Sequence, residues 1–251
     1  MSVLITGASS GIGLELAKVF ARHGYDLIIA ARSKEKMDIL KRELEASYKV
    51  KVDVCEVDLS SVSGADQLYQ AVKALGKEVE ILVNNAGAGY VGEFLEIEKE
   101  KDLSVMQLNM ASLTLLTKYF ARDMQKRRSG KILNVASTGS YHPGPYTAVY
   151  YATKAYVLSF SEALWIELKP YGISVSALCP GATKTNFAKN AGKEDASIAM
   201  SPEFMAQAAF KGLMKGKRVI VPGTRNKAFI KIPRSIAIHM ISKYQRGLKK
   251  Q

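Results

Sequence analysis

Residues 2–13 read SVLITGASSGIG, and this stretch decides the fold that we expect. Its first half, residues 2–6, is an apolar run typical of a buried strand. Glycines follow at positions 7, 11 and 13, and an amphipathic pattern predicts a helix from about Ile12 to His23. Glycines allow close approach of the backbone, and a helix N-terminus offers free N–H groups to an anion. This order predicts a pyrophosphate site; a tight strand-to-helix turn is the alternative.

The spacing of the three glycines separates this loop from two commoner ones. It is Gly-x-x-x-Gly-x-Gly, whereas the frequent dinucleotide-binding pattern is Gly-x-Gly-x-x-Gly. The loop is also not closed by Gly-Lys-Ser/Thr, so it is not a P-loop.

Strand and helix patterns alternate along the rest of the chain. We expect strands at residues 25–31, 50–57, 81–83, 131–136, 173–179 and 218–221, and helices at 34–48, 62–75, 101–126, 150–170 and 201–215. Such alternation predicts one α/β domain with a parallel sheet. The length of 251 residues and the hydrophobic content of 47% suit a single domain with a sizeable core.

Composition indicates the compartment. The two cysteines, Cys55 and Cys179, lie in apolar runs, which argues against a disulfide scaffold. The chain starts directly with a strand, shows no signal-peptide pattern, and has no run of 18 apolar residues. We therefore expect a cytoplasmic protein without a spanning helix and without a metal site.

The net charge of +13 is concentrated near the C-terminus. Residues 196–251 contain twelve lysines and arginines and one acidic residue, Glu203, whereas the rest of the chain is nearly neutral. Any effect of the positive charge on partners therefore belongs to this end.

The residues that end the second and third strands indicate which dinucleotide binds. An acidic residue after the second strand would accept hydrogen bonds from the adenosine ribose, but Arg32 stands there. Because a guanidinium suits a phosphate, Arg32 favours NADP(H) over NAD(H); a solvated arginine is the alternative. Asp58, followed by Leu59, ends the third strand, where it can receive the adenine amino group or cap the next helix.

Polar residues also follow later strands, at the edge where open α/β sheets bind ligands. NNAG at residues 84–87 can fix loops or the cofactor, and the Ser137 hydroxyl can donate to a substrate oxygen. Asn109 lies inside the helix expected at 101–126, where asparagine is unfavourable. We expect it to hold a water, to kink the helix or to be solvated.

Tyr150 and Lys154 are four residues apart and share one face of a helix. A free phenol loses its proton near pH 10, and a nearby ammonium lowers that pKa. The pair is therefore interpreted as a tuned proton donor with its cation, or, on the spacing alone, as a helix-surface pair. Tyr151 has Ala155 at the same spacing, which points to Tyr150.

Together these motifs resemble those of the short-chain dehydrogenase/reductase family. The matching elements are Thr6-Gly7-x-x-x-Gly11-x-Gly13, Asn84-Asn85-Ala86-Gly87, Asn109, Ser137, Tyr150-x-x-x-Lys154, and Pro180-Gly181 with Thr185. They follow the family's order over residues 2–185. The resemblance implies a Rossmann-like, doubly wound sheet of seven parallel strands in order 3-2-1-4-5-6-7. It also implies hydride transfer between a nicotinamide and a carbonyl or alcohol, and pairing through the two long helices as a homodimer or homotetramer.

The resemblance also implies roles for single residues. Tyr150 is the general acid in reduction, Lys154 lowers its pKa and binds the nicotinamide ribose, Ser137 holds the substrate oxygen, and Asn109 holds a water. The cofactor-binding residues that it implies are Gly7, Ser9, Ser10, Gly11, Ile12, Gly13, Arg32, Asp58, Leu59, Asn85, Ala86, Gly87, Tyr150, Lys154, Pro180, Gly181, Thr183 and Thr185.

Beyond the motifs, the chain divides into a catalytic domain at residues 1–221 and a tail at 222–251. By the same resemblance, residues 186–215 of the domain would choose the substrate. An apolar lid or part of the core is expected from Phe187, Ile198, Met200, Phe204 and Met205. The tail alternates apolar and basic residues, which predicts two helices lying on an anionic membrane, over the substrate mouth or in a subunit contact. No stacking aromatic pattern supports nucleic acid as a partner.

Two functions fit these features. One is an NADPH-dependent reductase of an apolar or acyl-type ketone, or the reverse alcohol dehydrogenase. The other is a non-catalytic NADP-binding or membrane-recruited regulator of the same fold. The presence of Ser137, Tyr150 and Lys154 favours the enzyme.

Overall fold

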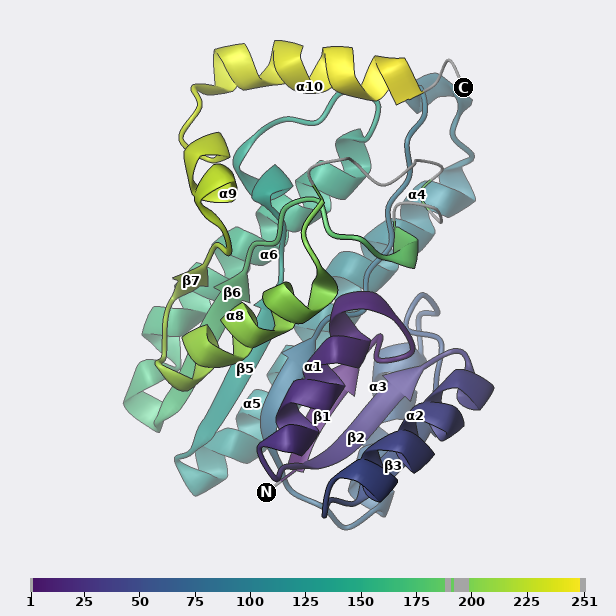
Figure 1. Ribbon diagram of the computed structural model, residues 1–251, viewed down its shortest axis with the longest axis vertical. Helices are drawn as coiled ribbons and strands as arrows, with labels where there is room; N and C mark the ends of the chain where they lie inside the picture. Colours follow the sequence, from purple (N-terminus) through teal and green to yellow (C-terminus); the bar gives the residue numbers. More distant parts are fainter. Residues whose placement is uncertain (1, 188–190, 192–198, 249–251) are drawn as a thin grey trace.

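Seven parallel strands form the centre of the molecule, in the order β3-β2-β1-β4-β5-β6-β7 (Figure 1). The computed structural model describes residues 2–187, 191 and 199–248. Every neighbouring pair of strands in this sheet is parallel. The strand order and direction expected from the resemblance are confirmed.

Strands and helices alternate as the sequence predicts. The strands are β1 (Ser2–Thr6), β2 (Asp26–Ala31), β3 (Val52–Glu56), β4 (Val79–Asn84), β5 (Gly130–Val135), β6 (Ile173–Leu178) and β7 (Val219–Ile220). The α-helices are α1 (Gly11–Arg22), α2 (Lys34–Ser47), α3 (Gly64–Ala74), α4 (Lys99–Met106), α5 (Leu113–Arg127), α6 (Ala148–Glu167), α8 (Pro202–Met214), α9 (Thr224–Phe229) and α10 (Arg234–Leu248). Short 3-10 turns are η1 (Phe94–Glu96), η3 (Thr138–Tyr141) and η4 (Lys169–Tyr171), and η2 (Gln107–Ser112) is a π-helical segment.

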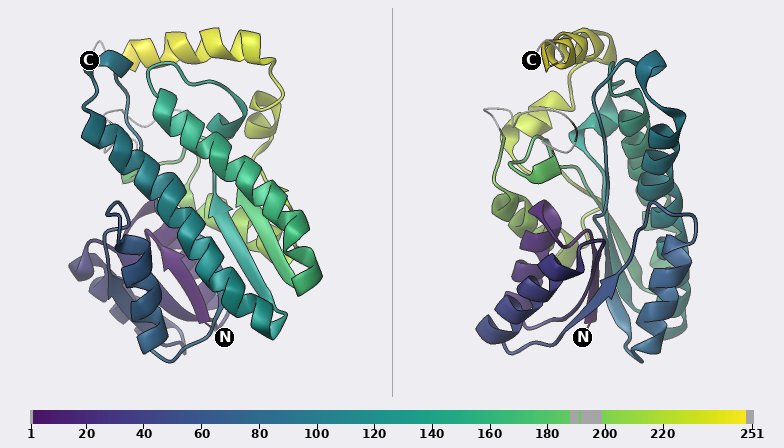
Figure 2. Two further views of the ribbon diagram at one scale, coloured as in Figure 1. Left: turned by 180° about the vertical axis from the view of Figure 1, so that it is seen from behind. Right: turned by 90° about the vertical axis from the view of Figure 1, so that its right-hand side faces the viewer.

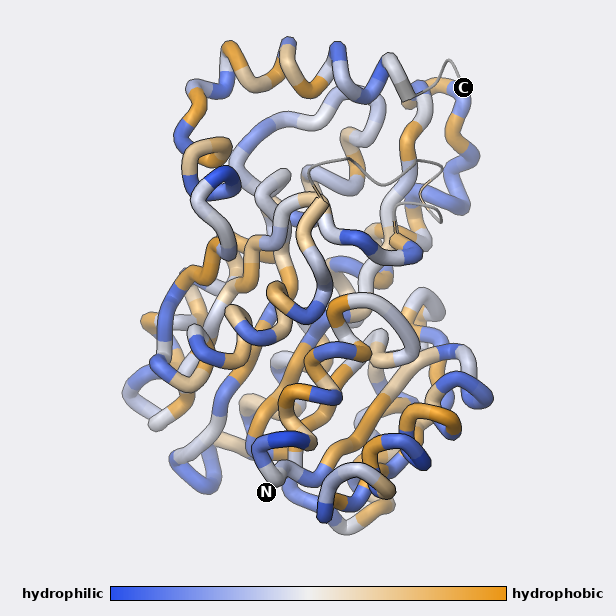
Figure 3. The backbone as a smooth tube through the Cα atoms, viewed as in Figure 1, coloured by the Kyte–Doolittle hydropathy of each residue, from blue (hydrophilic) through white to orange (hydrophobic). Residues whose placement is uncertain are grey.

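Helices cover both faces of the sheet (Figure 2). Alternate residues of β1 point to opposite faces: Val3 and Ile5 pack in one core cluster with α1, α2 and α8, and Leu4 packs in another with α3 and α5. The hydropathy colouring of Figure 3 shows largely hydrophobic strands, as a sheet covered on both faces requires. Because helices cover both faces, a ligand can reach the sheet at the carboxyl ends of its strands.

The long helix expected at residues 101–126 is three segments. α4 ends at Met106, η2 takes one wide turn, and α5 continues to Arg127. π-Turns inside helices are frequent at functional sites, and Asn109 lies in this one. Of the alternatives for Asn109, the solvated side chain is wrong, because it is buried and the helix changes its winding around it.

The tail forms two helices, and α10 packs on its own domain. Buried Ala237, Ile241 and Gln245 recur every fourth residue, so they mark the face that α10 turns inward. α10 crosses the end of the molecule beyond the loop that leads into α6 (Figures 1 and 2). Within the described part of the chain, no helix has the length and apolar character needed to span a bilayer.

Candidate active site

The loop after β1 has a backbone shape that glycine alone provides. Gly7 and Gly11 have φ values of +67° and +58°, in the left-handed region. At the third glycine, a Cβ on Gly13 would lie 2.3 Å from the carbonyl oxygen of Gly7. The loop therefore folds tightly onto the start of α1, and the cradle expected for a pyrophosphate is present in the backbone.

The start of α1 offers the groups that bind an anion. Ser10 is the N-cap residue, with an extended backbone, and its side chain makes no capping hydrogen bond to the described helix. Ser9, Ser10 and Ile12 stand at the turn where the free N–H groups point out of the helix. These residues fit a dinucleotide phosphate, and their binding role stays a prediction.

Asn85 joins the loops that follow β1 and β4. Its side-chain amide donates to the carbonyl oxygens of Thr6 at 2.9 Å and Gly7 at 3.2 Å. In return, the backbone N–H groups of Asn85 and Ala86 each donate to Thr6 Oγ1 at 3.0 Å. Of its two expected uses, Asn85 fixes the glycine loop.

Arg32 and Asp58 are exposed at the ends of β2 and β3. Asp58 Oδ1 accepts hydrogen bonds from the backbone N–H of Ser60 at 2.9 Å and from its hydroxyl at 2.6 Å. Burial raises the pKa of Asp58, but the Ser60 hydrogen bonds and the attraction of Arg32 outweigh it, so the pKa lies below its ordinary value. A charged carboxylate and a guanidinium thus stand together where the adenosine half of a dinucleotide would lie.

The structure also decides whether Asp58 caps the next helix and where Leu59 lies. α3 begins at Gly64 after Ser63, so the interpretation of Asp58 as its N-cap is wrong. Leu59 is buried in the core, and its carbonyl oxygen accepts a 2.6 Å hydrogen bond from Ser112. The Leu59 carbonyl is therefore already engaged in a hydrogen bond within the protein.

Asn109 binds the backbone beyond the NNAG turn. Its Oδ1 accepts from the N–H of Ala88 at 3.0 Å, and its Nδ2 donates to the carbonyl of Ala88 at 2.9 Å and to Thr153 Oγ1 at 3.0 Å. Gly87 lies between Asn109 and Lys154: a Cβ there would be 3.3 Å from Asn109 Oδ1 and 3.2 Å from Lys154 Nζ. Asn109 therefore positions the loop next to the lysine.

Ser137 lies beside Tyr150 and is held by its own loop. Ser137 Oγ accepts from the N–H of Gly139 at 3.0 Å, and the Ser137 N–H donates to Ser140 Oγ at 3.2 Å, which makes a capping box for η3. The bond between the Ser137 side chain and Tyr150 favours the phenolate. Two hydroxyl groups predicted to meet the substrate therefore lie side by side.

Lys154 is buried below Tyr150. Its Nζ donates to the carbonyl of Val135 at 2.7 Å and lies 5.9 Å from the centroid of the Tyr150 ring. Burial lowers the pKa of Lys154 to about 8. Burial also raises the pKa of Tyr150 above its ordinary value, against the opposing bond from Ser137. The expectation of a lowered phenol pKa is therefore wrong for this arrangement, because desolvation of the phenol outweighs the hydrogen bond from Ser137.

The segment after β6 returns to the glycine loop. Thr183 Oγ1 donates to the carbonyl of Gly181 at 3.0 Å, and Thr183 forms a parallel bridge with Met200. Further on, Thr185 lies against Gly11, where a Cβ would be 3.0 Å from its methyl group. Thr185 thus borders the cradle, and the cofactor-binding role of Pro180, Gly181 and Thr183 stays a prediction. The bridge to Met200 left no signal in the sequence.

The residues expected to form a substrate lid or core lie in different surroundings in the structure. Phe187 stacks obliquely on Tyr150, with ring centroids 5.5 Å apart, and so lines the site. Met205 is fully buried in the core and Phe204 is exposed on α8. Ile198 lies outside the described residues. Phe187 is the member of this group that the structure brings to the reacting end.

A buried polar chain behind the site was not predicted. Asn84 Nδ2 donates to Asn134 Oδ1 and to Thr117 Oγ1, each at 2.9 Å, and Asn134 Nδ2 donates to Ser161 Oγ at 3.0 Å. These bonds join β4, β5, α5 and α6 below the catalytic residues. The available signal was an asparagine in the apolar strand that ends at Ser137, since buried amides need partners.

Known proteins are similar to this chain over the part that carries these motifs. A family model described as short chain dehydrogenase matches residues 1–196. A very-long-chain 3-oxoacyl-CoA reductase of Phaeosphaeria nodorum is 30% identical over 92% of this chain and 67% of its own length. Rat 17-beta-hydroxysteroid dehydrogenase type 3 is 33% identical over 74% of this chain. The match covers 61% of that relative, so the chain spans less than two thirds of it.

Two solved structures are similar over the whole chain. A short-chain dehydrogenase from Sphingobium yanoikuyae in complex with NADPH has a TM-score of 0.85 and 31% identity, and covers 100% of this chain and 95% of its own. A bulky-bulky ketone specific alcohol dehydrogenase from Comamonas testosteroni has a TM-score of 0.81 and 30% identity, with coverage of 100% and 94%.

Proposed function

The chain belongs to the short-chain dehydrogenase family of oxidoreductases, and from this we propose that it is an NADP(H)-dependent ketone reductase. The observation that carries the proposal is the grouping of Tyr150 with the buried Lys154, whose Nζ lies 5.9 Å from the centroid of the Tyr150 ring. The substrate class that we propose is an apolar or acyl-type ketone, or the matching secondary alcohol in the reverse direction.

The residues fit a phosphorylated dinucleotide. The glycine cradle leaves no room for a side chain at Gly13, and the unused N-terminus of α1 suits the pyrophosphate. Arg32 supplies a guanidinium for a ribose phosphate, and the nearby Asp58 carboxylate attracts that guanidinium. The structural relative from Sphingobium, which is in complex with NADPH, supports the same choice.

We assign the proton to Tyr150. When bound, the nicotinamide supplies hydride chemistry, and the protein must supply orientation and a proton. Because the pKa of Tyr150 is raised, its phenol is protonated at neutral pH and can donate to a carbonyl oxygen. Ser137 donates a hydrogen bond to the same oxygen and fixes its position. Lys154 keeps a positive charge near the oxygen that loses the proton, and Asn109 positions the loop beside it.

Two features support an apolar substrate. The ring of Phe187 lies against that of Tyr150 and gives the reacting end an apolar wall. Relatives carry names that specify a 3-oxoacyl-CoA, a hydroxysteroid and a bulky-bulky ketone. All three are large carbonyl or alcohol compounds.

A ketone panel tests the proposal. We expect oxidation of NADPH with bulky aromatic ketones, 3-oxoacyl thioesters or 17-ketosteroids, and a clearly slower reaction with NADH. NADPH that binds but is not consumed with any member of the panel, in either direction, would show a non-catalytic binding protein and defeat the proposal.

The assembly and location that we propose follow from exposed residues and cysteines. Leu103 and Met106 on α4 and Ile166 on α6 are large exposed apolar residues on the helices expected to pair, which supports a homodimer or homotetramer. Cys55 and Cys179 are free and buried, which suits the reducing cytoplasm. Light scattering coupled to size exclusion tests the assembly, and a monomer at working concentration contradicts it.

A further inference from the structure

The outward side of α10 carries large apolar residues that other described parts of the chain leave uncovered. Ile236, Met240 and Tyr244 recur every fourth residue and are 54%, 51% and 49% exposed. They run beside the inward stripe of Ala237, Ile241 and Gln245 that fastens the helix to the domain. One face of α10 therefore holds it in place, and a second apolar stripe faces away.

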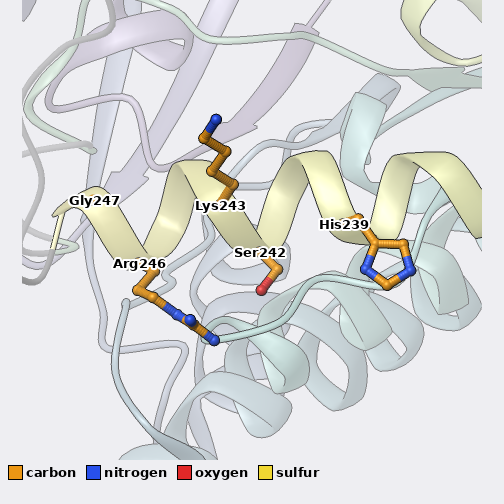
Figure 4. A pocket seen from close by; sticks show the side chains of 5 residues that line it. All are labelled: His239, Ser242, Lys243, Arg246 and Gly247. Carbon is orange, nitrogen blue, oxygen red and sulfur yellow. The ribbon is translucent and has the colours of Figure 1, made fainter.

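The polar part of the same helix carries cations on two sides (Figure 4). His239, Ser242, Lys243, Arg246 and Gly247 line a depression of about 440 Å³. Figure 4 shows the side chains of His239, Ser242 and Arg246 on one side of the ribbon and that of Lys243 on the other. Arg246 is held by a 3.0 Å hydrogen bond to Tyr146. Lys243 and Arg246 thus place cations on two sides of α10 (Figure 4), and each can pair with a phosphate group.

The whole tail has one sign of charge. Residues 222–251 contain eight lysines and arginines and no acidic residue. Figure 3 shows hydrophobic and hydrophilic bands alternating along α10. A helix with an apolar stripe, flanked by cations, is the pattern of an element that lies in a membrane interface.

We propose that α10 docks this protein on an anionic membrane surface. Ile236, Met240 and Tyr244 enter the boundary between head groups and acyl chains, and Lys243 and Arg246 on the two sides of the helix (Figure 4) pair with lipid phosphates. This inference goes beyond the proposed reductase function and does not depend on it.

The positive charge of the tail favours a lipid surface over a second copy of the chain or nucleic acid as the partner of the exposed side of α10. A second copy of the chain would bring an equally basic tail to a symmetric contact, and like charges would repel. Nucleic acid would use the cations but would leave Ile236 and Met240 exposed to water. An anionic bilayer accepts both the apolar stripe and the positive charge.

Docking in this way turns the reacting end toward the lipid. α10 rests on residues next to Tyr150: Arg246 binds Tyr146, and Gln245 is hydrogen-bonded to Tyr151. The exposed apolar residues Phe94 and Leu95 of η1 lie at the same end of the molecule as α10 (Figures 1 and 2). They extend the surface that would meet the membrane.

Vesicle co-sedimentation of the full chain tests the proposal. The protein should pellet with phosphatidylcholine vesicles that contain phosphatidylserine, and much less with phosphatidylcholine alone or at high salt. The double variant Ile236→Asp/Met240→Asp should lose about tenfold or more of this binding. Lys243→Gln should weaken binding to the anionic vesicles by about fivefold and change binding to neutral ones little.

The matched control is Ile39→Asp on α2, because Ile39 is 51% exposed, as Met240 is, and lies elsewhere in the fold. It should pellet as the original chain does, and all variants should keep the original far-UV circular dichroism. The proposal is overturned if the original chain stays in solution with anionic vesicles, or if Ile236→Asp/Met240→Asp pellets unchanged. It is also overturned if that double variant instead converts an oligomer to a monomer, which assigns the face to a second copy.

Discussion

Lys154 shows how the surroundings of one residue set its chemistry. It is a buried amine whose pKa falls to about 8 because burial disfavours its charged form. The unfolded chain keeps the ordinary pKa of 10.5. Between pH 8 and 10.5 the unfolded state therefore binds more protons than the folded state, and stability due to Lys154 rises with pH. Below pH 8 both states are charged, and the full cost of burying the ammonium remains.

Replacing Lys154 by Met should remove this dependence. The free energy of unfolding of the original chain, relative to Lys154→Met, should rise between pH 8 and 10 by at most about 1.4 kcal/mol per pH unit. Urea unfolding at a series of pH values measures it, with the exposed Lys118→Met on α5 as the control that keeps the original slope. If the free energy of unfolding changed with pH equally in the original chain and in Lys154→Met, a buried lysine with a lowered pKa would be contradicted.

Arg32 decides the cofactor in our account. Arg32→Ala should raise KM for NADPH by about tenfold or more, because a charge-assisted contact is lost, and should change KM for NADH much less. Steady-state kinetics with both cofactors measures this, and Arg42→Ala, an exposed arginine on α2, is the matched control. An equal effect of Arg32→Ala on both cofactors would remove Arg32 from the recognition of the phosphate.

At the residue scale, sequence spacing predicted which groups meet but not their electrostatic surroundings. The distance of four residues placed Tyr150 and Lys154 together, as found. The sign of the Tyr150 pKa shift depends on burial by segments such as the one holding Phe187, which spacing does not contain. Asn109 was recognised as unusual, whereas its partner Ala88 is visible only in three dimensions.

At the scale of elements, the turn from β1 into α1 depends on the absence of a side chain at Gly13. Alanine normally stabilises a helix relative to glycine by up to about 1 kcal/mol. Here Gly13→Ala should destabilise the protein by about 1–3 kcal/mol, because its Cβ meets the Gly7 carbonyl, and should weaken NADPH binding.

Gly247 in α10 provides the comparison, since a Cβ there has no atom within 4 Å. Gly247→Ala should leave the free energy of unfolding unchanged or raise it. Urea unfolding of the two variants, with NADPH titration by fluorescence, measures both effects. Equal stability for Gly13→Ala and Gly247→Ala would contradict the tight loop.

Element boundaries were predictable where periodicity alone sets them. The expected ends of the seven strands lie within two residues of the observed ends. The break at η2 was not, because a π-turn follows from the contact of Asn109 with a distant loop. The same holds for the bridge between Thr183 and Met200, which joins two segments without strand patterns.

At the scale of the whole molecule, the strand order came from the resemblance and the placement of the tail did not. Periodicity predicts strands but not their neighbours, whereas six motifs in one order identify a known topology. For the tail, the sequence allowed three placements. The structure shows α10 packed on its own domain through Ala237 and Ile241, with Ile236, Met240 and Tyr244 left exposed.

For the whole site, we infer that six segments of the chain place one protonated phenol beside a cofactor cradle. The most direct test compares Tyr150→Phe with Tyr151→Phe, whose ring instead packs on Gly144 and is hydrogen-bonded to Gln245. Turnover of a ketone found in the panel and the Kd for NADPH are measured for both. We predict that Tyr150→Phe lowers kcat by a factor of about 10²–10⁴ and leaves NADPH binding intact, while Tyr151→Phe keeps its turnover. Undiminished turnover in Tyr150→Phe would contradict the account.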